Sequence, residues 1–369
     1  MLDPGFTTPE MADVFTPAAR VGAMLEFEAA LALALADTGF VDMETARALV
    51  AACSAPVADP DAVLAATWSD GTPLRPLLEG IRSRLPDDLR EWAHYGATTQ
   101  DTIDTATMLQ ARKGLEVLDT GLIEVAGQMA ETTIRHRDQP HMGRTFLQHA
   151  RPTTFGFTVA GWLDATLAHV SELREARRGL AVQCGGPVGN LSAFGDRGSE
   201  VVAALAKRLG LAAPALPWHS DRSRVSALAA GLERATRTMA RVGIDVALLA
   251  SSDVAEIRVR GGGSSSMAGK QNPMDSVRAA AAAELCTAAA GAITGARLSE
   301  LERGIGGWHV EWAALPLVFQ TTAAAVEAIA SCLAGLEVKP EVMGVNVPTP
   351  EIDPRLIDGV IDAYQDLTG

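Results

Sequence analysis

A serine-rich loop at residues 261–273 carries the most reactive set of side chains in the sequence. It reads Gly-Gly-Gly-Ser-Ser-Ser-Met-Ala-Gly-Lys-Gln-Asn-Pro and precedes an apolar, alanine-rich stretch. Glycines give its backbone freedom to close over a ligand. Three hydroxyls, the cation of Lys270 and the amide of Asn272 can bind an anion and stabilise negative charge that develops in a reaction. The pattern predicts an anion-binding catalytic loop, with a flexible linker as the plain alternative.

This loop is not a nucleotide-binding P-loop. The P-loop spacing requires a glycine six residues before the lysine, and Ser264 stands there. Three other polar loops and a short motif hold most of the remaining groups suited to chemistry. They are HYGATTQDTIDT (94–105), GRTFLQHARPTTFG (143–156), QCGGPVGNLSAFGD (183–196) and PWHSDR (217–222).

Long helices must position these loops. Apolar residues recur every seven positions from about residue 103 to 129 and again from 225 to 249. Three more apolar or alanine-rich stretches complete a set of five predicted long helices, at 155–182, 274–298 and 311–336. In an antiparallel bundle, loops 94–105 and 183–196 lie at one end and the other two at the opposite end, roughly 42 Å away for a helix of about 28 residues. One site using all four loops must therefore be shared between chains.

Composition narrows the class of protein. The chain has 369 residues and a net charge of −14, with no basic run, which argues against nucleic-acid binding. The four cysteines are far apart and predict reduced, buried thiols, and no His, Asp or Glu spacing suggests a metal site. No apolar run reaches about 18 residues and no secretory signal is recognisable, so we expect a cytoplasmic protein without a membrane partner.

Two motifs resemble the fumarase/aspartase superfamily. The segment 263–273 is similar to its signature G-S-S-x-M-P-x-K-x-N-P, with Ala268 in place of proline. The segment 94–105 is similar to a second conserved region, and the resemblance extends over about residues 90–345. It implies an all-α fold with a long central helical bundle, and a homotetramer with active sites shared between subunits and no cofactor.

The loop 143–156 narrows the resemblance. Most superfamily lyases carry R-T-H-x-Q, whereas this sequence has Phe146, which cannot transfer a proton. Phe146 and the segments 185–191 and 217–222 resemble the bacterial 3-carboxymuconate cycloisomerases. That resemblance implies cofactor-free cycloisomerisation of 3-carboxy-cis,cis-muconate to 4-carboxymuconolactone, in the protocatechuate branch of the β-ketoadipate pathway. An adenylosuccinate-lyase-like enzyme that releases fumarate and a catalytically silent structural homologue remain the alternatives.

The resemblance also implies roles for individual residues. Ser264 is expected to transfer the proton, with Lys270 and His149 as the other catalytic residues. A small polycarboxylate substrate is expected to bind to His94, Thr98, Thr99, Gln100, Arg144, Thr145, Gln148, His219, Arg222, Ser265 and Asn272. We further expect a helical N-terminal domain over 1–105, a central bundle domain over 106–345, and a short remnant of the family's C-terminal domain over 346–369.

Overall fold

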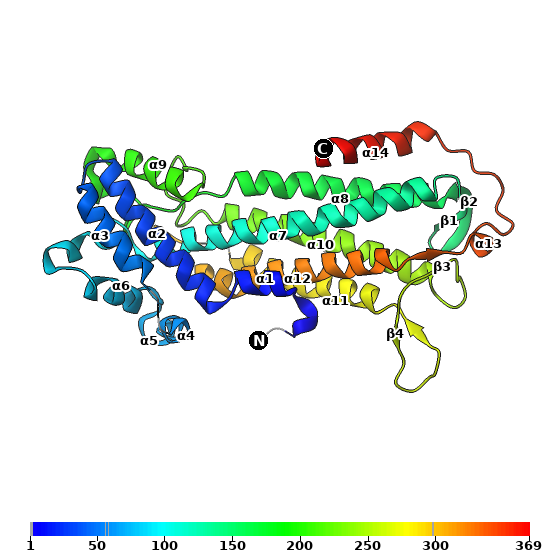
Figure 1. The fold of residues 1–369 in the computed structure, drawn as a ribbon, viewed down its shortest axis with the longest axis horizontal. Helices are drawn as coiled ribbons and strands as arrows, with labels where there is room; N and C mark the ends of the chain where they lie inside the picture. The colour runs from blue at the N-terminus through cyan, green and yellow to red at the C-terminus, as the bar shows by residue number, and fades with distance from the viewer. Residues whose placement is uncertain (1–2, 56, 58, 297–298) are drawn as a thin grey trace.

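Five long helices run side by side along the long axis of the molecule (Figure 1). The computed structural model describes residues 3–55, 57, 59–296 and 299–369. The long helices are α7 (Thr99–Arg135), α8 (Phe155–Arg178), α10 (Ser223–Leu249), α11 (Met274–Ala296) and α12 (Gly307–Ala334). The predicted all-α bundle is confirmed. The last two residues of the helix predicted over 274–298 lie outside the described residues.

Helix α7 begins earlier and is longer than the heptad pattern predicted. Thr98 and Asp101 form a capping box, in which the Asp101 carboxylate accepts the backbone N–H of Thr98 at 2.9 Å. The helix therefore starts at Thr99 instead of about residue 103. Its 37 residues span about 55 Å at 1.5 Å per residue. The two ends of the bundle are thus farther apart than the roughly 42 Å expected.

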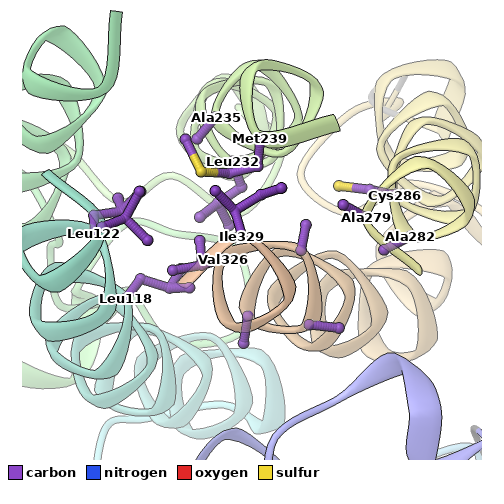
Figure 2. Close-up of a cluster of buried hydrophobic side chains, with 14 of the residues drawn as sticks. Leu118, Leu122, Leu232, Ala235, Met239, Ala279, Ala282, Cys286, Val326 and Ile329 are labelled. Atoms are coloured by element: carbon purple, nitrogen blue, oxygen red, sulfur yellow. The ribbon is translucent and has the colours of Figure 1, made fainter. Parts of the chain in front are cut away.

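The bundle core is built from small and medium apolar side chains. Figure 2 shows a section in which α12 lies between α7, α10 and α11. The side chains that meet there are fully or almost fully buried: Leu118, Leu122, Leu232, Ala235, Met239, Ala279, Ala282, Cys286, Val326 and Ile329. Alanines at these contacts let the helix backbones approach closely, so the bundle is a rigid frame for the segments at its ends.

A second apolar cluster forms the left end of the molecule in Figure 1, called the N-terminal end here because most of its helices come from residues 17–83. Its helices are α2 (Pro17–Asp37), α3 (Met43–Ser54), α4 (Pro60–Ala65), α6 (Leu74–Ser83) and α9 (Gly198–Leu209), with 3₁₀ helices at Asp87–Trp92 and Ser192–Arg197, and the short helix α5 (Thr67–Asp70) follows α4. The 3₁₀ helix Pro4–Phe6 and α1 (Pro9–Val14) pack instead against the bundle core. The cluster also contains Ile103, Ala106 and Leu109 of α7. Helix α7 runs unbroken through residue 105 and joins this cluster to the bundle. The three domain limits given above stay predictions.

Short two-stranded sheets occupy the opposite end of the bundle. Strand β1 (Pro140–Thr145) pairs with β2 (Gln148–Thr154), β3 (Ile257–Arg258) with β6 (Glu337–Val338), and β4 (Gly262–Gly263) with β5 (Gln271–Asn272), all antiparallel. Two segments that the sequence presented as loops, 143–156 and 261–273, therefore contain paired strands.

The C-terminal segment is a packed helix. After α13 (Pro340–Met343), helix α14 (Pro354–Thr368) folds back along α8 (Figure 1). Ile357 of α14 is buried, and Arg137, just after α7, lies 2.5 Å from the Asp358 carboxylate. Arg174 of α8 donates to the Leu367 carbonyl oxygen at 3.1 Å. The predicted remnant over 346–369 is thus attached to the outside of the bundle at both ends of α14.

Two helices, α11 and α12, are long and apolar enough to cross a membrane by length and composition alone. The apolar window of α12 is 72% buried, as expected for the central helix of a bundle, and that of α11 is 39% buried.

All four cysteines are buried free thiols, as predicted. Burial raises the pKa of Cys53 to about 12 and that of Cys332 to about 11, so both stay protonated at neutral pH.

Candidate active site

The predicted site residues lie in two groups at opposite ends of the bundle (Figure 1). At the N-terminal end, Asp101 accepts the backbone N–H groups of Gly185 and Gly186 at 3.0 and 2.9 Å, which joins loop 183–196 to the start of α7. At the other end, Arg144 of β1 is paired with Glu256, in the segment that follows α10. Helix α7, about 55 Å long, separates the groups. One chain does not bring them together.

Asp101 organises the N-terminal group. It is fully buried, and its Oδ1 lies 2.7 Å from Nε2 of His219. Gln100, also fully buried, donates its side-chain N–H to the His219 carbonyl oxygen at 3.0 Å. Gly96 permits this packing because its φ is +71° and an added Cβ would lie 2.3 Å from the Phe194 ring. His219 and Gln100 are therefore parts of a buried network, and Thr98 and Thr99 lie half-buried at its edge.

Arg222 is held by two carboxylates and offers no free edge to a substrate. Its guanidinium donates to Asp104 at 2.8 and 2.9 Å and to Glu311 at 2.9 and 2.5 Å. It also lies over the ring of Trp218, 4.9 Å from the centroid. Arg222 is 2% exposed. The prediction that Arg222 binds the substrate is corrected, because in this arrangement it cross-links α7, α10 and α12.

The electrostatics of this triad follow from its burial. Burial alone would lower the pKa of Arg222, but the two carboxylates outweigh that effect and raise it. Burial raises the pKa of Glu311, and the charge of Asp104 adds to the rise, while Arg222 opposes it. Trp308 donates its indole N–H to Oδ1 of Asp104 at 2.8 Å, which gives that carboxylate oxygen a further hydrogen bond. The cluster is a buried ion-pair network that depends on its one cation.

Arg303 brings an exposed cation to the same end, and sequence reasoning missed it. Its Nε donates to the Gln100 side-chain oxygen at 3.0 Å, and its Nη2 donates to the Thr98 hydroxyl at 3.1 Å. Arg303 lies in the connection between α11 and α12. A signal for it existed, because the turn between the fourth and fifth antiparallel helices must return to the end that holds loops 94–105 and 183–196. Arg303 replaces Arg222 as the candidate for contact with a substrate carboxylate.

The opposite group begins with the β1–β2 hairpin. Arg144 contacts both oxygens of Glu256, at 3.1 and 2.5 Å. Burial raises the pKa of Glu256, but the nearby His141 ring and the hydrogen bonds and charge of Arg144 outweigh it and leave that pKa below its ordinary value. Arg144 is therefore committed to fixing the hairpin. The predicted residues Thr145, Gln148 and His149 lie on the outer part of the hairpin and are exposed.

The tip of this hairpin is apolar, exposed and conformationally unusual. Phe146 and Leu147 form its two-residue turn with φ of +53° and +62°. Turns of this kind normally use asparagine and glycine, because other side chains are strained at positive φ. Phe146 is 98% exposed and Leu147 is 67% exposed. Neither strain nor exposure is explained by contacts within one chain.

The serine loop is a second hairpin that projects from the bundle near α11 (Figure 1). Ser264 stands directly after β4, and its Oγ accepts the backbone N–H groups of Ser266 at 3.3 Å and Met267 at 3.0 Å. Two donors on one oxygen stabilise negative charge there. Ser265 and Lys270 are exposed. Asn272 lies at the base, beside an open cavity of about 250 Å³. Among the described residues, no three His, Cys, Asp or Glu side chains form a group that could hold a metal ion.

Comparison with known proteins identifies the family. A profile of the lyase family matches residues 5–295, well over half of the chain. The chain belongs to this lyase family. A 3-carboxy-cis,cis-muconate cycloisomerase of Pseudomonas aeruginosa is 37% identical over 355 residues, which cover 94% of this chain and 77% of that relative. Trans-aconitate decarboxylase 1 of Mycosarcoma maydis is 34% identical over 347 residues, 93% of this chain and 70% of the relative.

A solved structure agrees with these relatives. The 3-carboxy-cis,cis-muconate lactonizing enzyme from Pseudomonas putida matches this fold with a TM-score of 0.86 at 33% sequence identity. The match covers 92% of this chain and 77% of that one. The resemblance to the fumarase/aspartase superfamily and the fumarase-like all-α fold are thereby confirmed, and the chain is an enzyme of this superfamily.

Proposed function

We propose that the protein converts 3-carboxy-cis,cis-muconate to 4-carboxymuconolactone without a cofactor, as a cytoplasmic enzyme of the protocatechuate branch of the β-ketoadipate pathway. The observation that carries the proposal is the serine hairpin, in which Ser264 Oγ accepts two backbone N–H groups and Lys270 follows six residues later in the same loop. Phe146, where other superfamily lyases have a histidine, favours this reaction over fumarate release. The muconate cycloisomerase relative and the matching lactonizing enzyme support the same assignment.

The chemistry requires an anion site, stabilisation of an enolate-like carboxylate and an acid. A substrate carboxylate oxygen forms the new C–O bond to one carbon of the double bond. The π electrons move onto the conjugated carboxylate, where Lys270 supplies compensating charge. Ser264 then gives its proton to the neighbouring carbon, and its oxygen is stabilised by the two N–H donors until it regains a proton from solvent. In the reverse direction Ser264 acts as the base.

The second part of the proposal is a homotetramer whose active sites combine both groups of residues. Helix α7 keeps the groups about 55 Å apart within one chain, so an antiparallel partner must supply the other group. The exposed Phe146 and Leu147 turn supports this arrangement. So does the apolar surface of α10 and α11, two helices that pack together and expose Ile244, Leu248, Val277 and Leu285. The remaining predicted catalytic residue, His149, would enter the site on the same hairpin.

The proposed reaction is tested by incubating the purified protein with 3-carboxy-cis,cis-muconate, trans-aconitate and adenylosuccinate, and following the ultraviolet absorbance of each. We expect turnover of the muconate at a kcat/KM at least about a hundredfold above either competitor. Trans-aconitate is included because of the 34% identical decarboxylase. Preferred release of fumarate from adenylosuccinate would overturn the proposal, and loss of all three activities would favour the catalytically silent homologue.

Shared sites predict complementation between two inactive variants. Ser264→Ala disables one end of the chain, and Thr98→Ala/Arg303→Gln disables the other. When the two proteins are mixed in equal amounts and allowed to exchange subunits, about a quarter of the composite sites should regain both intact groups. Activity should recover to about that fraction of the wild-type value. Each variant incubated alone is the control, and no recovery after exchange verified by mass spectrometry would exclude shared sites.

A further inference from the structure

A glutamate and a histidine from distant segments are paired beneath the loop that opens α7. Glu28 of α2 is 4% exposed, and its Oε1 lies 2.8 Å from Nδ1 of His94. The Thr102 hydroxyl donates to the same oxygen at 2.9 Å. Within the part of the chain that the structure describes, the buried Oε2 of Glu28 has no hydrogen-bond partner. A carboxylate is costly to bury in this way unless a cation faces it.

The backbone of His94 is also unusual. Its φ is +68°, in the left-handed region that side chains other than glycine rarely adopt. Strain of this kind persists where the surrounding structure holds a side chain in a particular place. Because Nδ1 donates to Glu28, the ring orientation and tautomer are fixed and Nε2 points to the other side of the ring. The side chain keeps 11% exposure, next to the loop that contains Thr98.

Charges from three neighbouring elements act on this imidazole, and a neutral thiol from a fourth lies beside it. Burial lowers the pKa of His94, but the charge and hydrogen bond of Glu28 on α2, joined by Asp101 on α7, outweigh it. Arg82 on α6 acts in the opposite sense. The Cys53 thiol of α3 lines the same small cavity as Glu28 and His94 and is neutral. The pKa of His94 ends above its ordinary value, so the ring stays cationic to higher pH.

We propose that Glu28 is a positioning residue that orients His94 and keeps it cationic, so that Nε2–H of His94 binds a carboxylate of the substrate. The inference rests on the proposed function, because a polycarboxylate substrate needs several cationic contacts. It adds Glu28, which lies 66 residues before His94 and belongs to no motif recognised in the sequence. Together with Arg303, the imidazolium gives the N-terminal group two positive charges close to Thr98.

Glu28→Gln tests the pairing because it keeps the shape of the side chain and removes its charge. We expect the pKa of His94, followed by NMR titration of the histidine ring signals and assigned with a His94→Gln spectrum, to fall, since the charge of Asp101 alone then opposes the effect of burial. At neutral pH the KM for 3-carboxy-cis,cis-muconate should rise on the order of tenfold, with kcat changed less than about threefold. In the wild type KM should rise as the pH passes upward through the His94 pKa, and in the variant that rise should move to lower pH.

Two matched variants separate positioning from loss of structure. Glu28→Asp retains the charge and should keep the His94 pKa above its ordinary value, and Thr102→Val removes only the hydroxyl donor and should do the same. An unchanged His94 titration in Glu28→Gln would overturn the pairing. A shifted titration with an unchanged KM would overturn its part in binding. Because the NMR titration needs no substrate, failure of the wild type to convert the muconate would count against the proposed function and not against the pairing.

Discussion

Ser264→Ala is expected to lower kcat for muconate cycloisomerisation by a factor on the order of 10² to 10⁴, the usual contribution of a positioned acid or base. The hydroxyl is the only part of the side chain that the substitution removes, and its oxygen accepts two backbone N–H groups of the same hairpin. Substrate binding should survive, because the proposed cationic contacts do not depend on this oxygen. KM should therefore change much less than kcat.

The measurement is a steady-state assay combined with a single-turnover experiment, so that chemistry is separated from product release. Ser171→Ala is the control, because Ser171 is an exposed residue on α8, between the two ends of the bundle, and should keep the wild-type rate. If the single-turnover rate of Ser264→Ala equals that of the wild type, Ser264 has no part in proton transfer and His149 or His94 becomes the candidate acid.

Lys270→Met should have a different kinetic signature. Lys270 is exposed on the same hairpin and is proposed to hold a substrate carboxylate and to stabilise the enolate. An interaction made in both the bound state and the transition state affects KM and kcat together. Steady-state constants should show both effects for Lys270→Met, whereas Ser264→Ala lowers kcat alone. Loss of kcat with an unchanged KM would assign Lys270 to the chemical step only.

Sequence reasoning was most successful where local rules dominate. Heptad spacing located two of the long helices, and apolar or alanine-rich stretches located the other three, all to within about six residues; antiparallel packing then placed each polar loop at the correct end. The start of α7 was missed by four residues because the capping box of Thr98 and Asp101 adds a turn that carries no heptad signal. The segment around Phe146 was taken for a loop because its turn places non-glycine residues at positive φ, against the usual preference.

Side-chain roles were harder to predict because they depend on contacts between distant segments. Arg222 lies beside His219 in a motif full of polar residues, and a free cation there is a reasonable expectation. Its partner Glu311 comes from α12, 89 residues later. Glu28 likewise meets His94 only after α2 folds against α7. A motif indicates which residues lie close together, whereas their ion-pair partners come from distant segments and are known only from the tertiary structure.

Arg222→Met is expected to destabilise the fold by about 3–5 kcal/mol, the cost of leaving a buried ion-pair network without its partner. Methionine fills much of the same volume but leaves the carboxylates of Asp104 and Glu311 buried together without a cation. The fall in stability is measured as a lower midpoint of thermal or urea unfolding. Arg355→Met is the control, because Arg355 pairs with Asp353 on the exposed surface and should leave the midpoint unchanged.

The pH dependence of that loss distinguishes an electrostatic cause from a packing defect. In the variant, burial and the charge of Asp104 raise the pKa of Glu311 above that of the unfolded chain, with no Arg222 to oppose them. The folded state then binds more protons than the unfolded state, so the stability of the variant relative to wild type should improve as the pH falls toward the ordinary carboxyl range.

Replacing both carboxylates as well, in Arg222→Met/Asp104→Leu/Glu311→Leu, should recover most of the midpoint, since a buried triad contributes little over a well-packed apolar core. A deficit that is independent of pH and persists in the triple variant would show that Arg222 stabilises the bundle through packing on Trp218 and not through its two carboxylates.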